Sequence, residues 1–288
     1  MSYQSTYLEY RRIFSTTEIK RLHELSTQYP YENFLSNVRN FEDRAIDYAY
    51  VSAKIEWNDY TSRGAVFLLK YGFTEERKTF KDALMLVSLK KAFEAVTRCP
   101  ATLKTILNKN YLCTRHTEIV EGLLPADQLG TVRQLPMEIL GSSYRPLADA
   151  KALDRELEKL FAVALTIDDP FDLCVYLHCN LIYLQYFSDG NKRLARLIQT
   201  AVLASKGLTP LFLQENDIDD YREAVIAYYE AGDYTAYKQL FLQAYEHSIL
   251  FLLGKTPKQI EAEKRALQSI RERQNSQFDD CSLIDSTE

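Results

Sequence analysis

The stretch of residues 171 to 186 is the most apolar helical run in the sequence, and Pro170 opens it. Proline is favoured in the first turn of a helix, where a missing backbone N–H costs nothing. A helix that is apolar on all sides is stable only where other elements cover it. This run therefore constrains the fold most strongly, and the polar turn that ends it is the first candidate for a functional feature.

Apolar residues recur at intervals of three and four along most of the chain, which is typical of helices with one buried face. Ser15 and Glu18 also have the spacing of a capping box at a helix start. Besides the apolar run, the pattern predicts helices over residues 15 to 28, 42 to 60, 61 to 71, 77 to 98, 149 to 164, 191 to 206, 217 to 230 and 234 to 253. The sequence therefore predicts an all-α fold.

Residues 122 to 146 are the exception, because this stretch holds three glycines and three prolines. Two short pieces between them, residues 131 to 133 and 137 to 140, could extend. Such a pattern predicts a short β-hairpin that stands apart as a flap.

Composition limits the class of protein. Of the 288 residues, 46% are hydrophobic and 26% are charged, as in a water-soluble globular protein. The net charge is −5 and no basic stripe is visible, so we expect no nucleic-acid partner. Five cysteines without a C-x-x-C pair argue against a disulfide framework, and neither a signal peptide nor a membrane span is indicated. We expect a cytoplasmic protein without membrane attachment.

The turn after the apolar run reads QYFSDGNKRLAR, from Gln185 to Arg196. Asp189 and Gly190 form a strong turn dipeptide, because glycine adopts positive φ freely. A turn of this kind before a helix directs backbone N–H groups at one point, where a phosphate can bind. Arg193 and Arg196 could reach the same anion through guanidinium forks, and Asp189 could hold Mg²⁺ beside it. The same residues are also compatible with an ordinary turn, after which Asn191 caps a helix with surface arginines.

This stretch resembles the signature of the Fic family, His-Pro-Phe-x-(Asp/Glu)-Gly-Asn-(Gly/Lys)-Arg-x-x-Arg. The matching positions, at the same spacing, are Phe187, Asp189, Gly190, Asn191, Lys192, Arg193 and Arg196. The resemblance extends over roughly residues 40 to 250, since the flap, the apolar helix and the helix containing Tyr221 follow in the family's order.

The resemblance implies a Fic-type helical fold and a protein adenylyltransferase, which transfers AMP from ATP to a hydroxyl of a target protein. The turn from Gly190 to Lys192, with Phe187 and Asn191, would form the phosphate site. Arg193 and Arg196 would stabilise the departing pyrophosphate, and Asp189 would hold Mg²⁺. The flap between Leu135 and Ser143 would dock the target protein as an added strand.

A second resemblance concerns inhibition of the nucleotide site. Many Fic proteins carry an inhibitory helix with the pattern (Ser/Thr)-x-x-x-Glu-(Gly/Asn), and this chain matches it at Ser52 and Glu56 but has Trp57 at the last position. A glutamate directed at Arg196 would occupy the space of the ATP γ-phosphate. The alternative is that Glu56 is an exposed helix residue without such a role.

The pattern departs from the family at its first position, where Gln185 replaces the histidine that acts as general base. An imidazole titrates near neutrality, whereas a carboxamide has no accessible basic state. His178, two helical turns earlier, is interpreted as a core residue. The remaining histidines, His23, His116 and His247, show no sign in the sequence of converging on the turn.

These observations leave three hypotheses. The first is an ATP-binding Fic protein that Glu56 inhibits and in which Gln185 impairs catalysis. The second is an active nucleotidyl- or phosphotransferase, because Lys192 also occurs in Doc-type relatives, which transfer the γ-phosphate. The third is a non-enzymatic interaction module, and a homo-oligomer is compatible with all three.

We expect three regions along the chain. Residues 1 to 110 would form an N-terminal helical region with the inhibitory helix at about 42 to 60, and residues 111 to 254 the Fic core. Residues 255 to 288 would form a charged C-terminal helix and a mobile tail.

Overall fold

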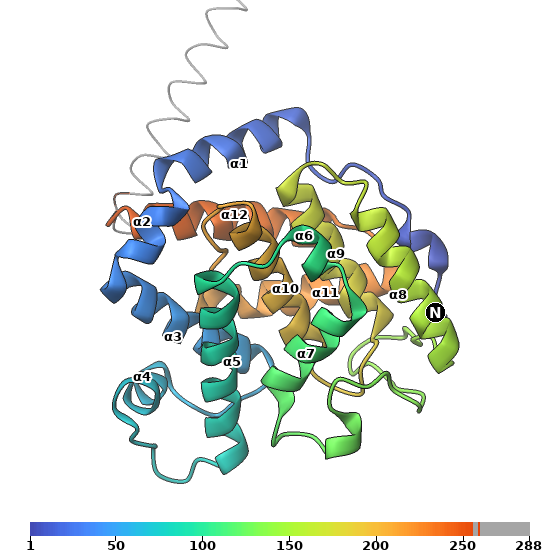
Figure 1. Cartoon of the computed structure of the whole chain (residues 1–288), viewed down its shortest axis with the longest axis horizontal. Coiled ribbons are helices and arrows are strands. Elements are labelled where there is room, and N and C mark those ends of the chain that lie inside the picture. Colours follow the sequence, from blue (N-terminus) through green and yellow to red (C-terminus); the bar gives the residue numbers. More distant parts are fainter. Residues whose placement is uncertain (256–258, 260–288) are drawn as a thin grey trace, which may run out of the picture.

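The computed structural model describes residues 1 to 255 and residue 259. Over this part of the chain the fold is helical, and the only strand-like pairings are two isolated bridges, which confirms the predicted all-α class (Figure 1). The α-helices are α1 (Thr16–Gln28), α2 (Tyr31–Ser36), α3 (Val38–Ile55), α4 (Ser62–Tyr71), α5 (Phe80–Arg98), α6 (Leu103–Ile106), α7 (Lys109–Val120), α8 (Ala150–Ala164), α9 (Pro170–Leu184), α10 (Asn191–Ser205), α11 (Ile218–Ala231) and α12 (Thr235–Leu252). A 3₁₀ turn, η1 (Ser5–Leu8), precedes α1, and two more, η2 (Ala126–Gln128) and η3 (Glu215–Asp217), lie between later helices.

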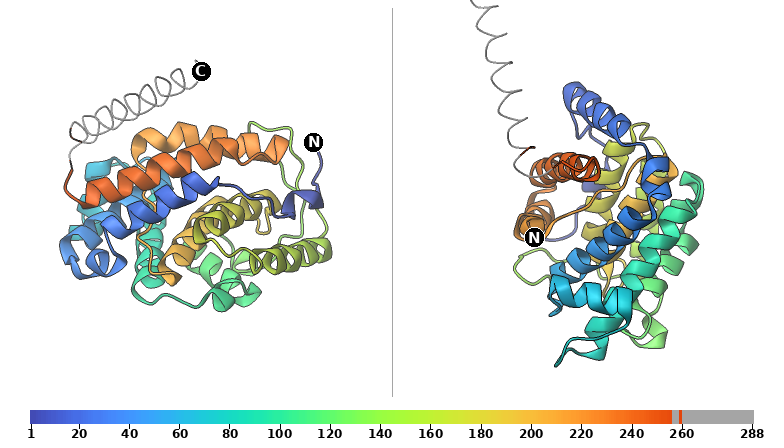
Figure 2. Two further views of the ribbon diagram at one scale, coloured as in Figure 1. Left: turned by 90° about the horizontal axis from the view of Figure 1, so that it is seen from above. Right: turned by 90° about the vertical axis from the view of Figure 1, so that its left-hand side faces the viewer.

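The apolar run forms α9, in which every residue after Pro170 is buried. α10 packs against α9 in the middle of the molecule, and α5 and α7 pack against α10 (Figure 1). α8, α11 and α12 cover α9, while α1 lies along α12 (Figure 2). The polar turn therefore joins two helices that are packed on several sides, and their packing fixes its position.

Most helices begin and end where local chemistry predicts. At the start of α1, the Ser15 hydroxyl accepts from the Glu18 amide and the Glu18 side chain accepts from the Ser15 amide, so the predicted capping box is formed. α4 ends at Gly72, which adopts φ +76°. Three helices, α2, α6 and α7, are not apparent in the sequence pattern, and α3 starts earlier and ends earlier than the predicted 42 to 60.

The segment expected to form a β-hairpin carries no strand ladder in the structure, which is a correction to the sequence-based expectation. Residues 131 to 149 instead form an irregular loop whose one bridge joins Ser2 to Arg145. Pro136 and Pro146 supply no backbone N–H, so two positions of a ladder would lack their donor. We call residues 131 to 149 the flap loop.

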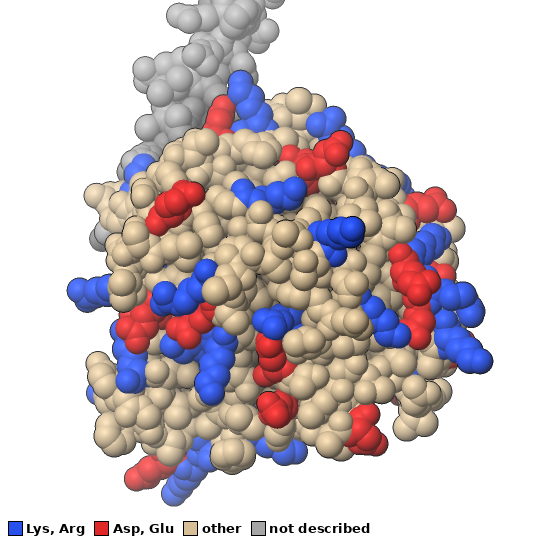
Figure 3. Space-filling view, viewed as in Figure 1, with Lys and Arg blue, Asp and Glu red and all other residues tan. Residues whose placement is uncertain are grey.

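The expected C-terminal helix and tail from residue 255 onward lie almost entirely outside the described residues. No helix in residues 1 to 255 combines the length and the apolar character needed to cross a bilayer. On the face seen in Figure 3, basic and acidic side chains are interspersed and form no continuous basic stripe.

Candidate functional site

Two residues with positive φ define the turn between α9 and α10. Gln185 ends α9 with φ +48°, an uncommon conformation for a residue with a side chain, and Gly190 precedes α10 with φ +79°. Glycine is required at the second position for a further reason. A Cβ on Gly190 would lie 2.7 Å from Cγ1 of Val120 and 3.3 Å from Nε2 of His116.

The side chain of Gln185 is buried, and both its amide nitrogen and its amide oxygen form hydrogen bonds. Its Nε2 donates to the carbonyl of Ile182 at 2.8 Å and to the Tyr229 hydroxyl at 2.9 Å. Its Oε1 accepts from Nδ2 of Asn191 at 3.0 Å. The backbone carbonyl of Gln185 accepts from Nε of Arg133 at 2.6 Å. These bonds offset the cost of the left-handed backbone and hold the amide in one orientation.

Asn191 does not cap α10, contrary to the sequence-based prediction. It is the first residue of α10, and its side chain reaches backward across the turn. Oδ1 accepts from the Phe187 amide at 3.0 Å, and Nδ2 donates to the Phe187 carbonyl at 2.8 Å as well as to Gln185. Because the cap position is Gly190, no side chain satisfies the first N–H groups of the helix, and these stay available to an anion.

His116, on α7, contacts the turn, and no pattern in the sequence predicts this contact. Its Nδ1 accepts from the Gly130 amide at 3.0 Å, so the proton lies on Nε2, which donates to the Asp189 carbonyl at 2.9 Å. The ring stacks on Phe187 at 3.8 Å between centroids. Burial lowers the pKa of His116 to about 4, with the neighbouring Arg193 charge acting in the same direction, so the ring is neutral at pH 7.

Arg193 and Asp189 form an ion pair at the start of α10, with 2.9 Å between Nη2 and Oδ2. Desolvation opposes ionisation of Asp189, but the charge of Arg193 and the hydrogen bond from the Gly190 amide lower its pKa overall. The Asp189 side chain is 59% exposed, whereas Arg193 is buried, and its Nε and Nη1 have no hydrogen-bond partner. Buried guanidinium nitrogens without a partner are costly, and Arg193 is not among the residues that line the cleft next to the turn.

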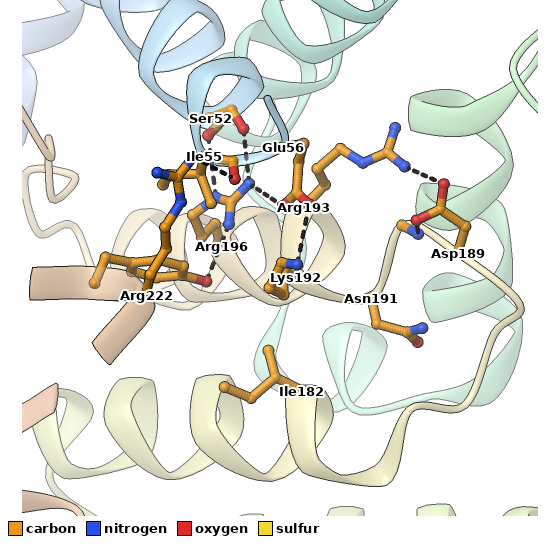
Figure 4. A network of polar contacts seen from close by, with 12 residues as sticks. Ser52, Ile55, Glu56, Ile182, Asp189, Asn191, Lys192, Arg193, Arg196 and Arg222 are labelled. Atoms are coloured by element: carbon orange, nitrogen blue, oxygen red, sulfur yellow. Dashed lines mark hydrogen bonds and ion pairs between the residues drawn. The ribbon is translucent and has the colours of Figure 1, made fainter. Parts of the chain in front are cut away.

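Arg196 points the other way, toward α3 and α11 (Figure 4). Its Nε donates to the Ser52 hydroxyl at 3.2 Å and its Nη2 to the Ser52 carbonyl at 2.9 Å. Nη1 donates to the Tyr221 hydroxyl at 3.0 Å. The remaining partner is the Glu56 carboxylate, 3.1 Å from Nη2.

Glu56 contacts a second cation, because its other oxygen lies 3.1 Å from Nζ of Lys192 (Figure 4). Burial opposes ionisation of Glu56, but the charges of Arg196, Lys192 and Arg193 hold its pKa below the usual value. The carboxylate is therefore an anion held between residues of α10, at the place where α3 ends.

A cleft of about 400 Å³ opens beside this cluster. Its walls are the end of α3, the flap loop, the start of α10 and α11. Arg133 secures the flap loop, because its guanidinium donates to the carbonyls of Leu135 and Leu147 while it also contacts Gln185. Glu56, Asp189, Asn191 and Lys192 all line the cleft, whose volume lies in the range typical of small-molecule sites.

The structure brings the predicted residues together at the turn, but Gly190, Arg193 and Arg196 do not line the cleft itself. Phe187 is buried in the core against His116 and supports the turn without lining the cleft. His178 is a core residue, as predicted, stacked on Tyr237 and 3.0 Å from the Tyr221 hydroxyl. No group of three metal-ligating side chains occurs in the described part of the chain.

The fold and this cluster define a helical protein in which Arg196 and Lys192, on a central helix, hold the Glu56 carboxylate. Residues 106 to 203, which contain α9, the turn and most of α10, match the Fic/DOC family. Over this stretch the chain is similar to that family. Over 54 residues it is 37% identical to the protein adenylyltransferase Fic of Nematostella vectensis, a match that covers 19% of this chain and 13% of that protein.

Solved structures share the fold over most of the chain. Fic-1 from C. elegans superposes with a TM-score of 0.67 at 18% identity, covering 83% of this chain and 71% of that structure. A Fic family protein from Desulfovibrio desulfuricans gives 0.68 at 16% identity, with 85% and 77% coverage. A Fic-domain signalling protein from Bacteroides thetaiotaomicron gives 0.66 at 17% identity and is covered over 98% of its length.

Proposed function

We propose that this chain binds ATP in the cleft between α3, α10, α11 and the flap loop, and that Glu56 inhibits this binding. The observation that carries the proposal is the double ion pair of Glu56 with Arg196 and Lys192, each at 3.1 Å. Two cations on one helix hold an anion supplied by another part of the same chain. When Glu56 withdraws, the same cations are free to bind a phosphate group of a nucleotide.

The phosphate site has further components around this pair. The first backbone N–H groups of α10 have no helical acceptor and no capping side chain. Nε and Nη1 of Arg193 are buried without partners a short way along the same helix. A polyphosphate laid along the start of α10 would satisfy the backbone donors, and the helix dipole favours its negative charge. It would reach Arg193 once the Arg193 side chain turned toward the cleft, which it does not line in this structure.

A magnesium ion would fit at Asp189. The carboxylate is ionised, lines the cleft and is more than half exposed, so it is accessible to a hydrated ion. Magnesium commonly binds through one or two carboxylates together with the phosphates of the substrate, and it would neutralise part of their charge. Asp189 would exchange its ion pair with Arg193 for the metal, which leaves all of Arg193 for phosphate.

Gln185 is why we propose impaired transfer. In an adenylyltransferase reaction a hydroxyl of the target loses its proton as it attacks the α-phosphate. The Gln185 amide stands at the position of the family's general base but cannot take a proton, and its hydrogen bonds are already directed to Ile182, Tyr229 and Asn191. It can orient a group, and it cannot remove a proton from one.

The target would be a protein that docks along the flap loop. Leu135 and Leu140 are exposed large apolar side chains on this loop, at 76% and 94%. The loop carries no strand ladder of its own, so an extended segment of the target would pair with the loop backbone near Met137 and Leu140. ATP is abundant in the cytoplasm, where we place this protein.

The test is calorimetry of Mg·ATP binding to the native chain and to Glu56→Gly. We expect weak or undetectable binding by the native chain and at least about tenfold tighter binding by Glu56→Gly, since a buried ion pair no longer competes. ATP labelled at the α- or the γ-phosphate then distinguishes AMP transfer from phosphate transfer. If neither protein binds ATP, the proposal fails; rapid labelling of targets by the native chain would contradict both the inhibition and the role given to Gln185.

A further inference from the structure

The turn that presents Glu56 is a Schellman motif at the end of α3. The Asn58 amide donates to the Ala53 carbonyl at 3.1 Å, and the Trp57 amide donates to the Lys54 carbonyl at 3.0 Å. In this motif the residue after the helix cap adopts the left-handed conformation, which glycine and asparagine tolerate best. Glu56 is the cap residue, so the following position is the one that needs positive φ.

Trp57 occupies that position with φ +65°. A bulky side chain in this conformation is strained, so another interaction must compensate. The compensation is not burial, because Trp57 is 74% exposed. Its indole ring instead covers the guanidinium of Arg222, which lies 3.7 Å from the ring centroid.

Arg222, on α11, also holds the end of α3 directly. Its Nη2 donates to the carbonyls of Lys54 and Ile55 at 3.0 and 3.2 Å. These are carbonyls of the last helical turn, which have no amide donor four residues later in the helix and attract a positive charge. Nη1 donates to Asp219 at 3.1 Å, which orients the guanidinium on its own helix. Ile55 and Arg222 lie together at the side of the Glu56 cluster (Figure 4).

We propose that Trp57 and Arg222 form a latch that sets how tightly Glu56 occupies the anion site. This inference rests on the proposed inhibition by Glu56 and concerns its regulation. Arg222 acts as a positioning residue, because it touches the backbone that presents Glu56 and not the carboxylate itself. Two adjacent residues of α11 thus contact the two sides of one ion pair. Tyr221 contacts Arg196, and Arg222 contacts the turn from which Glu56 reaches Arg196.

The latch predicts that loosening the turn admits ATP even when Glu56 is intact. Arg222→Ala removes both hydrogen bonds to the α3 carbonyls, the one to Asp219 and the contact with the indole. We expect Mg·ATP affinity about three- to tenfold higher than that of the native chain and no higher than that of Glu56→Gly. Arg222→Lys keeps a cation over the indole and should restore part of the inhibition.

Trp57 provides an independent test on an exposed side chain whose replacement leaves the core untouched. Trp57→Ala loses the ring but keeps the strained backbone, whereas Trp57→Gly loses the ring and relieves the strain. ATP should therefore bind more tightly to Trp57→Ala than to Trp57→Gly. Equal affinities, or the reverse order, would contradict the latch.

The decisive experiment is calorimetry of Mg·ATP with the native chain, Glu56→Gly, Arg222→Ala and the double variant. Arg222 also lines the cleft, so a direct contact with ATP must be distinguished from positioning. If Arg222 only positions Glu56, Arg222→Ala should change the affinity for Mg·ATP by less than about twofold in the Glu56→Gly background, since that background has no carboxylate to position. A drop in affinity in that background, or no gain in the native background while Glu56→Gly gains, overturns the latch and leaves the proposed function standing. Absence of any gain from Glu56→Gly would instead refute the proposed function.

Discussion

Asn191 donates a hydrogen bond of 3.0 Å from its Nδ2 to Oε1 of Gln185, so the two ends of the motif turn are joined by their side chains. The bond matters because Gln185 sits in the left-handed region and Asn191 begins α10. Together they fix both the orientation of the amide and the separation of the two central helices at the turn.

Gln185→His tests whether the amide is what limits transfer. An imidazole has two ring nitrogens and can keep two of the three side-chain hydrogen bonds, so the turn should persist. In the Glu56→Gly background we expect incorporation of label from α-labelled ATP to rise by about 10² to 10⁴ over Glu56→Gly alone, the usual contribution of a general base. Equal labelling by the single and the double variant would show that the proton leaves by another route.

Gly190→Ala should destabilise the protein and abolish ATP binding. The new methyl group meets Val120 at 2.7 Å, and alanine is strained at φ +79°. We expect the free energy of unfolding to fall by about 1 to 3 kcal/mol. Gly207→Ala is the matched control, because Gly207 has φ +65° just past the other end of α10 and nothing within 4 Å of its Cβ position. Similar losses in urea unfolding for both variants would mean that backbone strain, and not the contact under the turn, decides the cost.

The helices were largely predictable because their information is local. Apolar spacing and caps such as Ser15 with Glu18 depend on residues within one or two turns. α7 was missed because its buried face contains His116 between Leu112 and Ile119, so the apolar spacing is interrupted. The role of His116 is recognisable only from the turn that it supports. The flap loop shows the reverse error, because short extendable stretches do not form a ladder where prolines interrupt the donors.

The site was predictable as far as the motif extends. The pattern directs Glu56 at Arg196, and the structure places these two side chains in contact. The bond from Arg196 to the Ser52 hydroxyl was not predicted, although Ser52 matches the pattern. The pattern gives no sign that Lys192 contacts Glu56 as well, because a lysine at that position has many possible partners. The departure at Trp57 becomes intelligible only from the backbone, where positive φ explains why the family pattern has glycine or asparagine there.

The pH dependence of the free energy of unfolding should show that the two buried histidines have lowered pKa values in the native protein. Burial lowers the pKa of His116 to about 4 and the pKa of His178 well below its usual value. The unfolded chain therefore takes up protons below pH of about 6.5 while the native protein does not, and stability falls as the pH falls. Each group contributes a slope of about 1.4 kcal/mol per pH unit between roughly pH 6 and 5. His116→Gln should halve this slope in urea unfolding; an unchanged slope would show that His116 is protonated in the native state.

Lys192→Met separates two roles that the same ammonium group would play. In the native chain the substitution removes one of the two cations that hold Glu56, which should loosen the inhibiting carboxylate. It also removes a cation from the proposed phosphate site, which should weaken ATP binding. With Glu56→Gly only the second effect remains, so Lys192→Met should lower Mg·ATP affinity there by about threefold to tenfold, and by less in the native chain. Because the Lys192 side chain is 37% exposed, its loss should change the free energy of unfolding by less than about 1 kcal/mol. Calorimetry on the four proteins gives the two affinities in each background, and an equal loss in both would mean that Lys192 does not help to hold Glu56.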